Sequence, residues 1–135
     1  MKSVKMMTAA ALLSSTLLFG GSPSTSHAQV PVYYCQGLVA TIVGTSGNNI
    51  LQGNSSDNVI VGLGGNDIIE GKGGKDTICG GEGNDTLYGD GNDDNLSGDS
   101  GDDTLRGGDG RDLLDGGTGN DNCNGGLGNN TVFNC

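Results

Sequence analysis

Apolar positions follow a nine-residue period over most of the chain. Glycine recurs at every ninth residue from Gly44 to Gly125, and the unit that it opens is repeated ten times without insertion, over residues 44–133. The eighth position of every unit is apolar: Leu51, Ile60, Ile69, Ile78, Leu87, Leu96, Leu105, Leu114, Cys123 and Val132. Because successive side chains of a strand point to opposite faces, the last three positions predict a short strand whose middle side chain points inward.

The first six positions of each unit predict a turn. The fourth position is glycine except at Ser56 and Asn92, which makes these two turns the least certain. Glycine accepts positive φ and lets backbone carbonyl oxygens approach one another closely. The sixth position is always Asn or Asp: Asn49, Asn58, Asp67, Asp76, Asp85, Asp94, Asp103, Asp112, Asp121 and Asn130.

The complete pattern resembles a known calcium-binding repeat. Residues 80–88 read Gly-Gly-Glu-Gly-Asn-Asp-Thr-Leu-Tyr, which is similar to the G-G-x-G-x-D-x-U-x nonapeptide of the repeats-in-toxin (RTX, hemolysin-type) family. The resemblance implies an all-β fold, a right-handed parallel β-roll in which two repeats form one coil. A disordered Gly/Asn/Asp-rich segment is the alternative interpretation, but disorder does not require an apolar residue at every eighth place.

The resemblance also implies where calcium binds. Turns 18 residues apart would stack about 4.8 Å apart, one strand spacing, and calcium takes six to eight oxygen ligands. The ligand role of the family falls on the sixth-position residues, which predicts up to about eight sites. Asp67, Asp85, Asp103 and Asp121 would form one column of aspartates, and Asp76, Asp94 and Asp112 the other. Sites that include Asn49, Asn58 or Asn130 are expected to be weaker, because each lacks one charge.

Calcium is expected to be required for folding. The array has one inward side chain for every nine residues, and its acidic residues repel one another. When a binding site forms only in the folded state, the free energy of metal binding contributes directly to folding. We therefore expect the array to be unfolded without a cation.

Residues 1–28 have the order of a cleaved secretory signal. Lys2 and Lys5 precede an apolar run from Met6 to Phe19, and a small-x-Ala sequence ends at Ala28. The run is shorter than the roughly 20 apolar residues of a membrane helix, so a retained membrane anchor is the less favoured alternative. The prediction is a secreted, extracellular protein that begins at Gln29, with no insertion into membranes.

Charge and composition restrict the partners. Beyond residue 28 the chain has four basic residues against 16 acidic ones, a formal net charge of −12. This charge repels nucleic acid and anionic membranes and favours cations, and a monomer is expected. The same part has no histidine for a catalytic triad or a zinc site, which predicts a non-enzymatic module. The alternatives are a calcium-dependent adhesive or ice-binding roll and a remnant of a larger RTX hydrolase.

The ends of the array are expected to carry caps and disulfides. Residues 29–43 are predicted to form an N-terminal cap, and residues 134–135 form a short C-terminal tail. Four cysteines in an oxidising compartment allow three pairings, of which Cys35–Cys79 with Cys123–Cys135 is favoured. Ile50, Val59, Val61 and Ile68 should point outward. We expect the leading segment to cover them, with a protein partner as the alternative.

Overall fold

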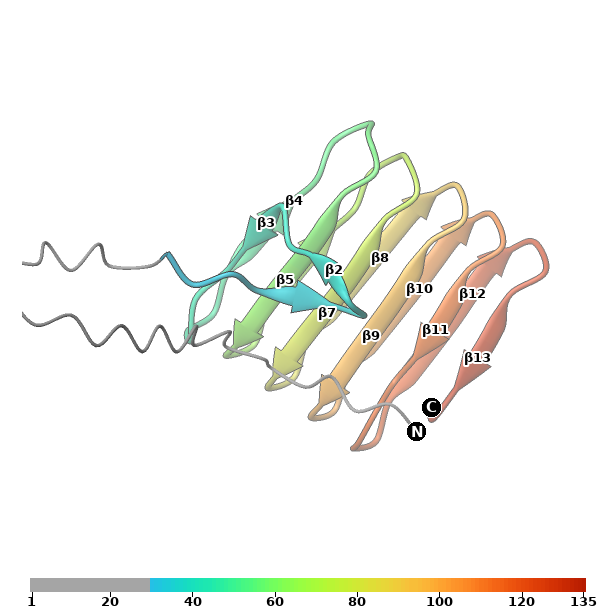
Figure 1. Cartoon of the computed structure of the whole chain (residues 1–135). Coiled ribbons are helices and arrows are strands. Elements are labelled where there is room, and N and C mark those ends of the chain that lie inside the picture. The colour runs from blue at the N-terminus through green and yellow to red at the C-terminus, as the bar shows by residue number, and fades with distance from the viewer. Residues whose placement is uncertain (1–29) are drawn as a thin grey trace, which may run out of the picture.

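The computed structural model describes residues 30–135, and these residues form strands and turns without a helix. The segment predicted as a secretory signal, residues 1–28, lies outside the described residues, as does Gln29. The strands form a stack of coils, and the chain alternates between two sheets as it advances (Figure 1). Over residues 30–135 no helix has the length and apolar character to cross a bilayer.

The two main sheets are parallel, with neighbouring strands 18 residues apart in sequence. Ile60 pairs with Ile78 in one sheet and Leu87 with Leu105 in the other. The six-stranded sheet contains β3 (Ile42–Val43), β5 (Val59–Gly64), β7 (Thr77–Glu82), β9 (Asn95–Ser100), β11 (Leu113–Asp115) and β13 (Thr131–Phe133). The five-stranded sheet contains β4 (Ile50–Gln52), β6 (Ile68–Glu70), β8 (Thr86–Gly91), β10 (Thr104–Asp109) and β12 (Asn122–Leu127). The predicted all-β parallel β-roll is confirmed, with its ten repeats wound into about five coils.

The core is one column of eighth-position side chains between the two sheets. Seven of them are fully buried: Ile60, Ile69, Ile78, Leu87, Leu96, Leu105 and Leu114. Leu51 and Cys123 pack against this column, and Ile42 extends it by one position before the first repeat, as predicted. The prediction of an inward side chain was wrong for Val132, which is 44% exposed and outside this column, because its strand β13 pairs with β11 alone at the edge of the sheet. Burying one such side chain stabilises a fold by about 1.5–3 kcal/mol, which for ten repeats is a small core.

Six of the ten strands in the repeats are longer than the three residues that the pattern predicts. β5 continues from Val59 to Gly64, through the first three positions of the next repeat. It does so because pairing with the next coil resumes after Gly62, where Leu63 pairs with Gly81 and Gly64 with Glu82. The extended strands leave turns of only a few residues between the sheets.

The N-terminal segment forms a hairpin on the side of the roll. β1 (Tyr34–Cys35) and β2 (Leu38–Val39) pair antiparallel, and β1 contacts β5 and β7 (Figure 1). The predicted disulfide Cys35–Cys79 is present, and with Val61 these cysteines form a second buried cluster, against which Val59 packs.

This placement confirms half of the expected coverage. The hairpin covers Val59 and Val61 on the six-stranded sheet. Ile50 and Ile68 lie on the five-stranded sheet and remain 73% and 43% exposed. The expectation that the leading segment covers all four was therefore wrong for these two, because strands of consecutive repeats lie on opposite sheets. The second predicted disulfide, Cys123–Cys135, is also present.

Candidate metal centre

The sixth-position side chains stand in two columns, one along each edge of the roll. In the first eight repeats the backbone N–H of the sixth residue donates to Oδ1 of the residue 18 positions later, with distances of 2.7–2.9 Å. One column runs Asn49, Asp67, Asp85, Asp103, Asp121, and the other runs Asn58, Asp76, Asp94, Asp112, Asn130. All ten predicted residues therefore occupy the predicted columns, and each link joins neighbouring coils.

The second carboxylate oxygen of six aspartates has no hydrogen-bond partner. It is Oδ2 of Asp67, Asp76, Asp85, Asp94, Asp103 and Asp112, and it is buried in each case. A buried polar group without a partner costs about 1–3 kcal/mol, and more if it is charged. Six such atoms in the same position of six turns are placed to coordinate a cation.

Backbone carbonyl oxygens surround the same space. A methyl group added to Gly62 would collide with Oδ2 of Asp67 and with the carbonyl oxygen of Gly80 in the next coil. The first-position glycines from Gly71 to Gly116 have the same two kinds of neighbour, a carboxylate of their own repeat and a carbonyl 18 residues later. Glycine is needed here for space, because a side chain would fill the cleft in which these oxygen atoms converge.

Burial changes the acidity of the column. It raises the pKa of Asp85 and of Asp94 to about 7 and that of Asp103 to about 6, and neighbouring acidic side chains add to each rise. Burial also raises the pKa of Asp67, Asp76 and Asp112 above the ordinary value of 3.8. Without a cation the ionised form of these side chains is therefore disfavoured in the folded roll.

The donor set suits calcium. Each cleft combines carboxylate oxygens with backbone carbonyls, which are the hard ligands that calcium takes in flexible geometry. Residues 30–135 contain no group of three or more His, Cys, Asp or Glu side chains placed to hold a metal. The clefts do not form such a group, because each brings together at most two carboxylates and draws its other oxygens from the backbone.

The first two turns differ from those that follow. Oδ1 of Asn49 accepts the N–H of Thr45 at 2.6 Å, and Oδ1 of Asn58 accepts that of Asn54 at 2.9 Å. These side chains satisfy their own turns without a cation. Nothing in the nonapeptide pattern indicated this difference, apart from Asn in place of Asp.

The backbone conformation at the fourth position also distinguishes the first two turns from the rest. From Gly65 onward every fourth-position residue has a left-handed φ, including Asn92 at +79°, but Gly47 and Ser56 do not. The uncertain turn at Asn92 thus keeps the common conformation, because asparagine tolerates this region. The turn at Ser56 departs from it, and so does the turn at Gly47.

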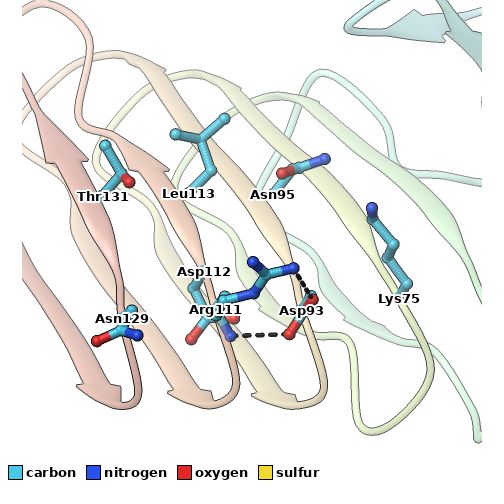
Figure 2. Close-up of a pocket in the computed structure, with 8 residues that line it drawn as sticks. All are labelled: Lys75, Asp93, Asn95, Arg111, Asp112, Leu113, Asn129 and Thr131. Carbon is cyan, nitrogen blue, oxygen red and sulfur yellow. Dashed lines mark hydrogen bonds and ion pairs between the residues drawn. The ribbon is translucent and has the colours of Figure 1, made fainter.

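A second ladder, which the sequence analysis missed, runs along the fifth positions. The N–H of Asn84 donates to Oδ1 of Asn66 at 2.9 Å, and the N–H of Asp102 donates to Oδ1 of Asn84 at 3.1 Å. On the other edge Arg111 donates through its N–H to Asp93 and forms an ion pair with it at 3.4 Å (Figure 2). The Asn and Asp residues recurring at this position were the available indication.

Sequence comparisons agree with this geometry. A sequence model of the RTX calcium-binding nonapeptide repeat (4 copies) matches residues 43–78, 70–105 and 97–132. No curated protein and no solved structure matches the chain significantly. Because the three matched segments together span residues 43–132 of a 135-residue chain, the protein belongs to the family of RTX calcium-binding nonapeptide repeats.

Proposed function

We propose that this protein is a secreted, non-enzymatic calcium-binding module whose folding is coupled to calcium binding. The observation that carries the proposal is the set of six buried carboxylate oxygens without a partner. RTX repeats bind calcium as β-rolls, and in this chain the unpartnered oxygens lie in the clefts between stacked turns.

The proposed ligands are the sixth-position side chains with nearby turn carbonyls. Five clefts lie between two aspartates, and each contains an unpartnered oxygen. Among the three mixed clefts, the one between Asp112 and Asn130 also contains such an oxygen, on Asp112. The clefts that begin at Asn49 and Asn58 should bind calcium more weakly, because the amide oxygens there already accept backbone hydrogen bonds.

The coupling to folding follows from burial. Ionised carboxylates in a solvent-excluded column oppose folding unless a cation compensates their charge. Calcium supplies that compensation and links neighbouring coils through shared ligands. The roll is therefore proposed to form only where calcium is abundant, as it is outside cells.

Secretion is proposed on two grounds. Two disulfides lie within residues 30–135, and disulfides persist in oxidising compartments. The N-terminal 28 residues have the order of a secretory signal. A structural or binding role, with calcium as the partner, fits a chain whose repeats occupy most of its length.

The proposal is tested by a matched pair of substitutions in one turn. Asp103 is buried in the column and Asp102 beside it is exposed, and both accept a backbone N–H through Oδ1. Asp103→Asn and Asp102→Asn therefore remove the same charge and keep the same acceptor. In a calcium titration followed by circular dichroism, Asp103→Asn should raise the folding midpoint several-fold and Asp102→Asn should leave it nearly unchanged. Equal midpoints would contradict the assignment of the column as the calcium site.

A further inference from the structure

The C-terminal tail continues the coil beyond the tenth repeat. Asn134 stands 18 residues after Gly116, and the N–H of Gly116 donates to the carbonyl oxygen of Phe133 at 3.1 Å. The N–H of Gly71 makes the same bond to Tyr88 one coil later, at 2.8 Å. Asn134 also donates through Nδ2 to Oδ1 of Asp115 at 2.8 Å. The tail is therefore in register with the repeats, as though an eleventh repeat began at Asn134.

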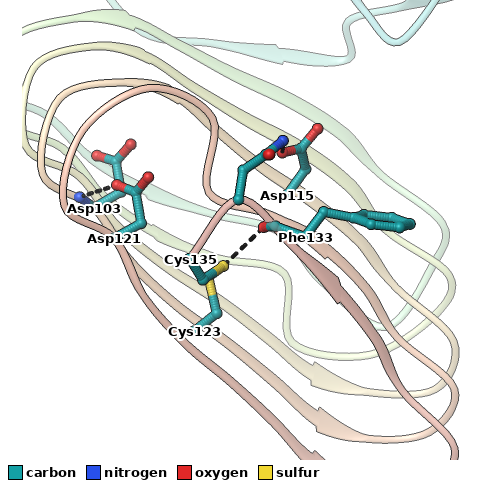
Figure 3. The surroundings of a disulfide bond; sticks show 7 residues. Asp103, Asp115, Asp121, Cys123, Phe133 and Cys135 are labelled. Carbon is teal, nitrogen blue, oxygen red and sulfur yellow. Dashed lines mark hydrogen bonds between the residues drawn. A yellow bond between two sulfur atoms is a disulfide. The ribbon is translucent and has the colours of Figure 1, made fainter. Parts of the chain in front are cut away.

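A disulfide holds the tail in this position. Cys135 is bonded to Cys123, which occupies an inward eighth position of the ninth repeat (Figure 3). Asp121 lies two residues before Cys123, and its Oδ1 accepts the N–H of Asp103 at 2.8 Å. The disulfide thus fixes the tail to the strand that follows Asp121, the last aspartate of this column.

The tail places a carbonyl oxygen next to Asp121. A methyl group added to Gly116 would meet the carbonyl oxygen of Asn134 and Oδ2 of Asp121. The corresponding test at Gly62 gives the same pair of atoms, from Gly80 and Asp67. Asp121 therefore takes part in two clefts, one with Asp103 and one with the tail.

The corresponding position of the other column has different neighbours. The three atoms nearest to a methyl group at Gly125 all belong to Asn130, the neutral sixth-position residue of the tenth repeat. At Gly116 the nearest atom is the carbonyl oxygen of Asn134, and the sixth-position residue there is the charged Asp121. A carboxylate and a carbonyl oxygen thus converge at Gly116, which points to a cation on the tail side.

We propose that Asp121 and the main-chain carbonyl of Asn134 form an additional terminal calcium site, which the Cys123–Cys135 disulfide assembles. The inference rests on the proposed calcium function but goes beyond it, because Asn134 lies outside the repeats and contributes a backbone oxygen. The disulfide acts as a positioning element, since it fixes the tail over the turn that contains Asp121.

Native mass spectrometry tests this site, because it counts bound ions one at a time. The oxidised protein at saturating calcium is compared with a variant that carries Cys123→Ser and lacks residues 134–135. The shortened variant should bind one calcium ion fewer. An equal count in the two proteins would overturn the terminal site while leaving the calcium function intact. A protein that binds no calcium at all would overturn both proposals.

Two full-length variants test whether the loss of the ion depends on the position of the Asn134 main-chain carbonyl. Asn134→Ala keeps the main-chain carbonyl and the disulfide, so it should retain the full ion count. Cys123→Ser with Cys135→Ser frees the tail and should lose the same single ion as the shortened variant. Hydrogen exchange of residues 62–109 in calcium reports whether the interior coils of each variant remain folded. Loss of the ion from Asn134→Ala in a folded roll would contradict the carbonyl assignment.

Discussion

The sixth-position side chains of the first two turns differ in their hydrogen bonding from those of the turns that follow. In residues 44–61 the sixth-position amides of Asn49 and Asn58 accept hydrogen bonds from their own turns. From residue 62 to residue 112 the same position holds buried carboxylates, each with one unpartnered oxygen. A turn whose sixth-position oxygen accepts an N–H from the same turn therefore needs no cation. A turn in which one carboxylate oxygen has no donor does need one.

Hydrophobic packing also differs along the roll. The N-terminal end has two buried layers, the central column and the cluster of Cys35, Val61 and Cys79 at the hairpin. The later coils have the central column, and a second disulfide joins Cys123 to Cys135. Because the cluster includes Cys79 of the fourth repeat, its support extends past the two neutral turns to the turn that contains Asp76. The N-terminal coils should therefore depend less on metal than the later coils.

Removing calcium should have the largest effect on the structure, because the later turns depend on it. A chelator at neutral pH leaves the buried carboxylates without a counter-charge, so most of the β signal in circular dichroism should be lost. Returning calcium should restore it cooperatively in the millimolar range. Magnesium is the control, because it prefers strict octahedral geometry and gives up its water reluctantly. Recovery in magnesium equal to that in calcium would argue against sites of this kind.

Removing the N-terminal disulfide should be the next largest effect. Cys35→Ser with Cys79→Ser removes a link between residues 44 positions apart, and disulfides typically contribute about 2–4 kcal/mol. The calcium-loaded protein should lose roughly that much stability in urea. Because this loss lies at the N-terminal end, the number of bound calcium ions should stay the same. A lower ion count would mean that the hairpin also supports the clefts.

Lowering the pH should stabilise the metal-free roll but weaken its binding of calcium. Burial raises the pKa of Asp85 and Asp94 from 3.8 to about 7. The metal-free roll is therefore most stable below pH 3.8, where these groups are protonated in both states, and it loses this stability as the pH rises through about 7. Calcium needs the ionised form, so its affinity should fall as the pH is lowered.

These two effects can be measured by circular dichroism at several pH values. The desalted, metal-free protein should contain more β structure at pH 5 than at pH 8. The calcium concentration needed for half-folding should instead rise below about pH 4, where protons compete with calcium for carboxylates that are ionised in the unfolded chain at higher pH. Metal-free samples that fold better at pH 8 would show that the buried carboxylates do not control the metal-free state.

The smallest expected effect comes from making the first turn resemble the later ones. Asn49→Asp keeps the oxygen that accepts the N–H of Thr45 and lies near the carbonyl of Gly62. It replaces the amide nitrogen, which donates to Oγ1 of Thr45, with an ionisable oxygen. The variant should bind calcium more tightly at this turn and lose a little metal-free structure. Native mass spectrometry at limiting calcium would detect the change, and Asn48→Asp at the neighbouring exposed position is the control. Identical behaviour of the two variants would contradict the distinction between the turns.

The sequence predicted what depends on the nine-residue period. The inward column from Ile42 to Cys123, the two sixth-position columns and both disulfides follow from positions 9 or 18 residues apart or from the pairing of the ends. It did not predict the hydrogen bonds within single turns or the packing on the outer faces of the sheets. The amide bonds of Asn49 and Asn58, the fifth-position ladder and the hairpin on β5 and β7 are of this kind. These features depend on turn geometry and on contacts between distant segments, which a linear pattern does not contain.

Segment-resolved hydrogen exchange, with and without calcium, tests the central claim most directly. We predict that the amides of β8 to β13 are protected in calcium and lose that protection on chelation. The amides of β1, β2 and β5, which lie around the Cys35–Cys79 disulfide, should keep more of their protection. Protection of β8 to β13 that persists in the chelated protein would contradict the coupling of folding to calcium.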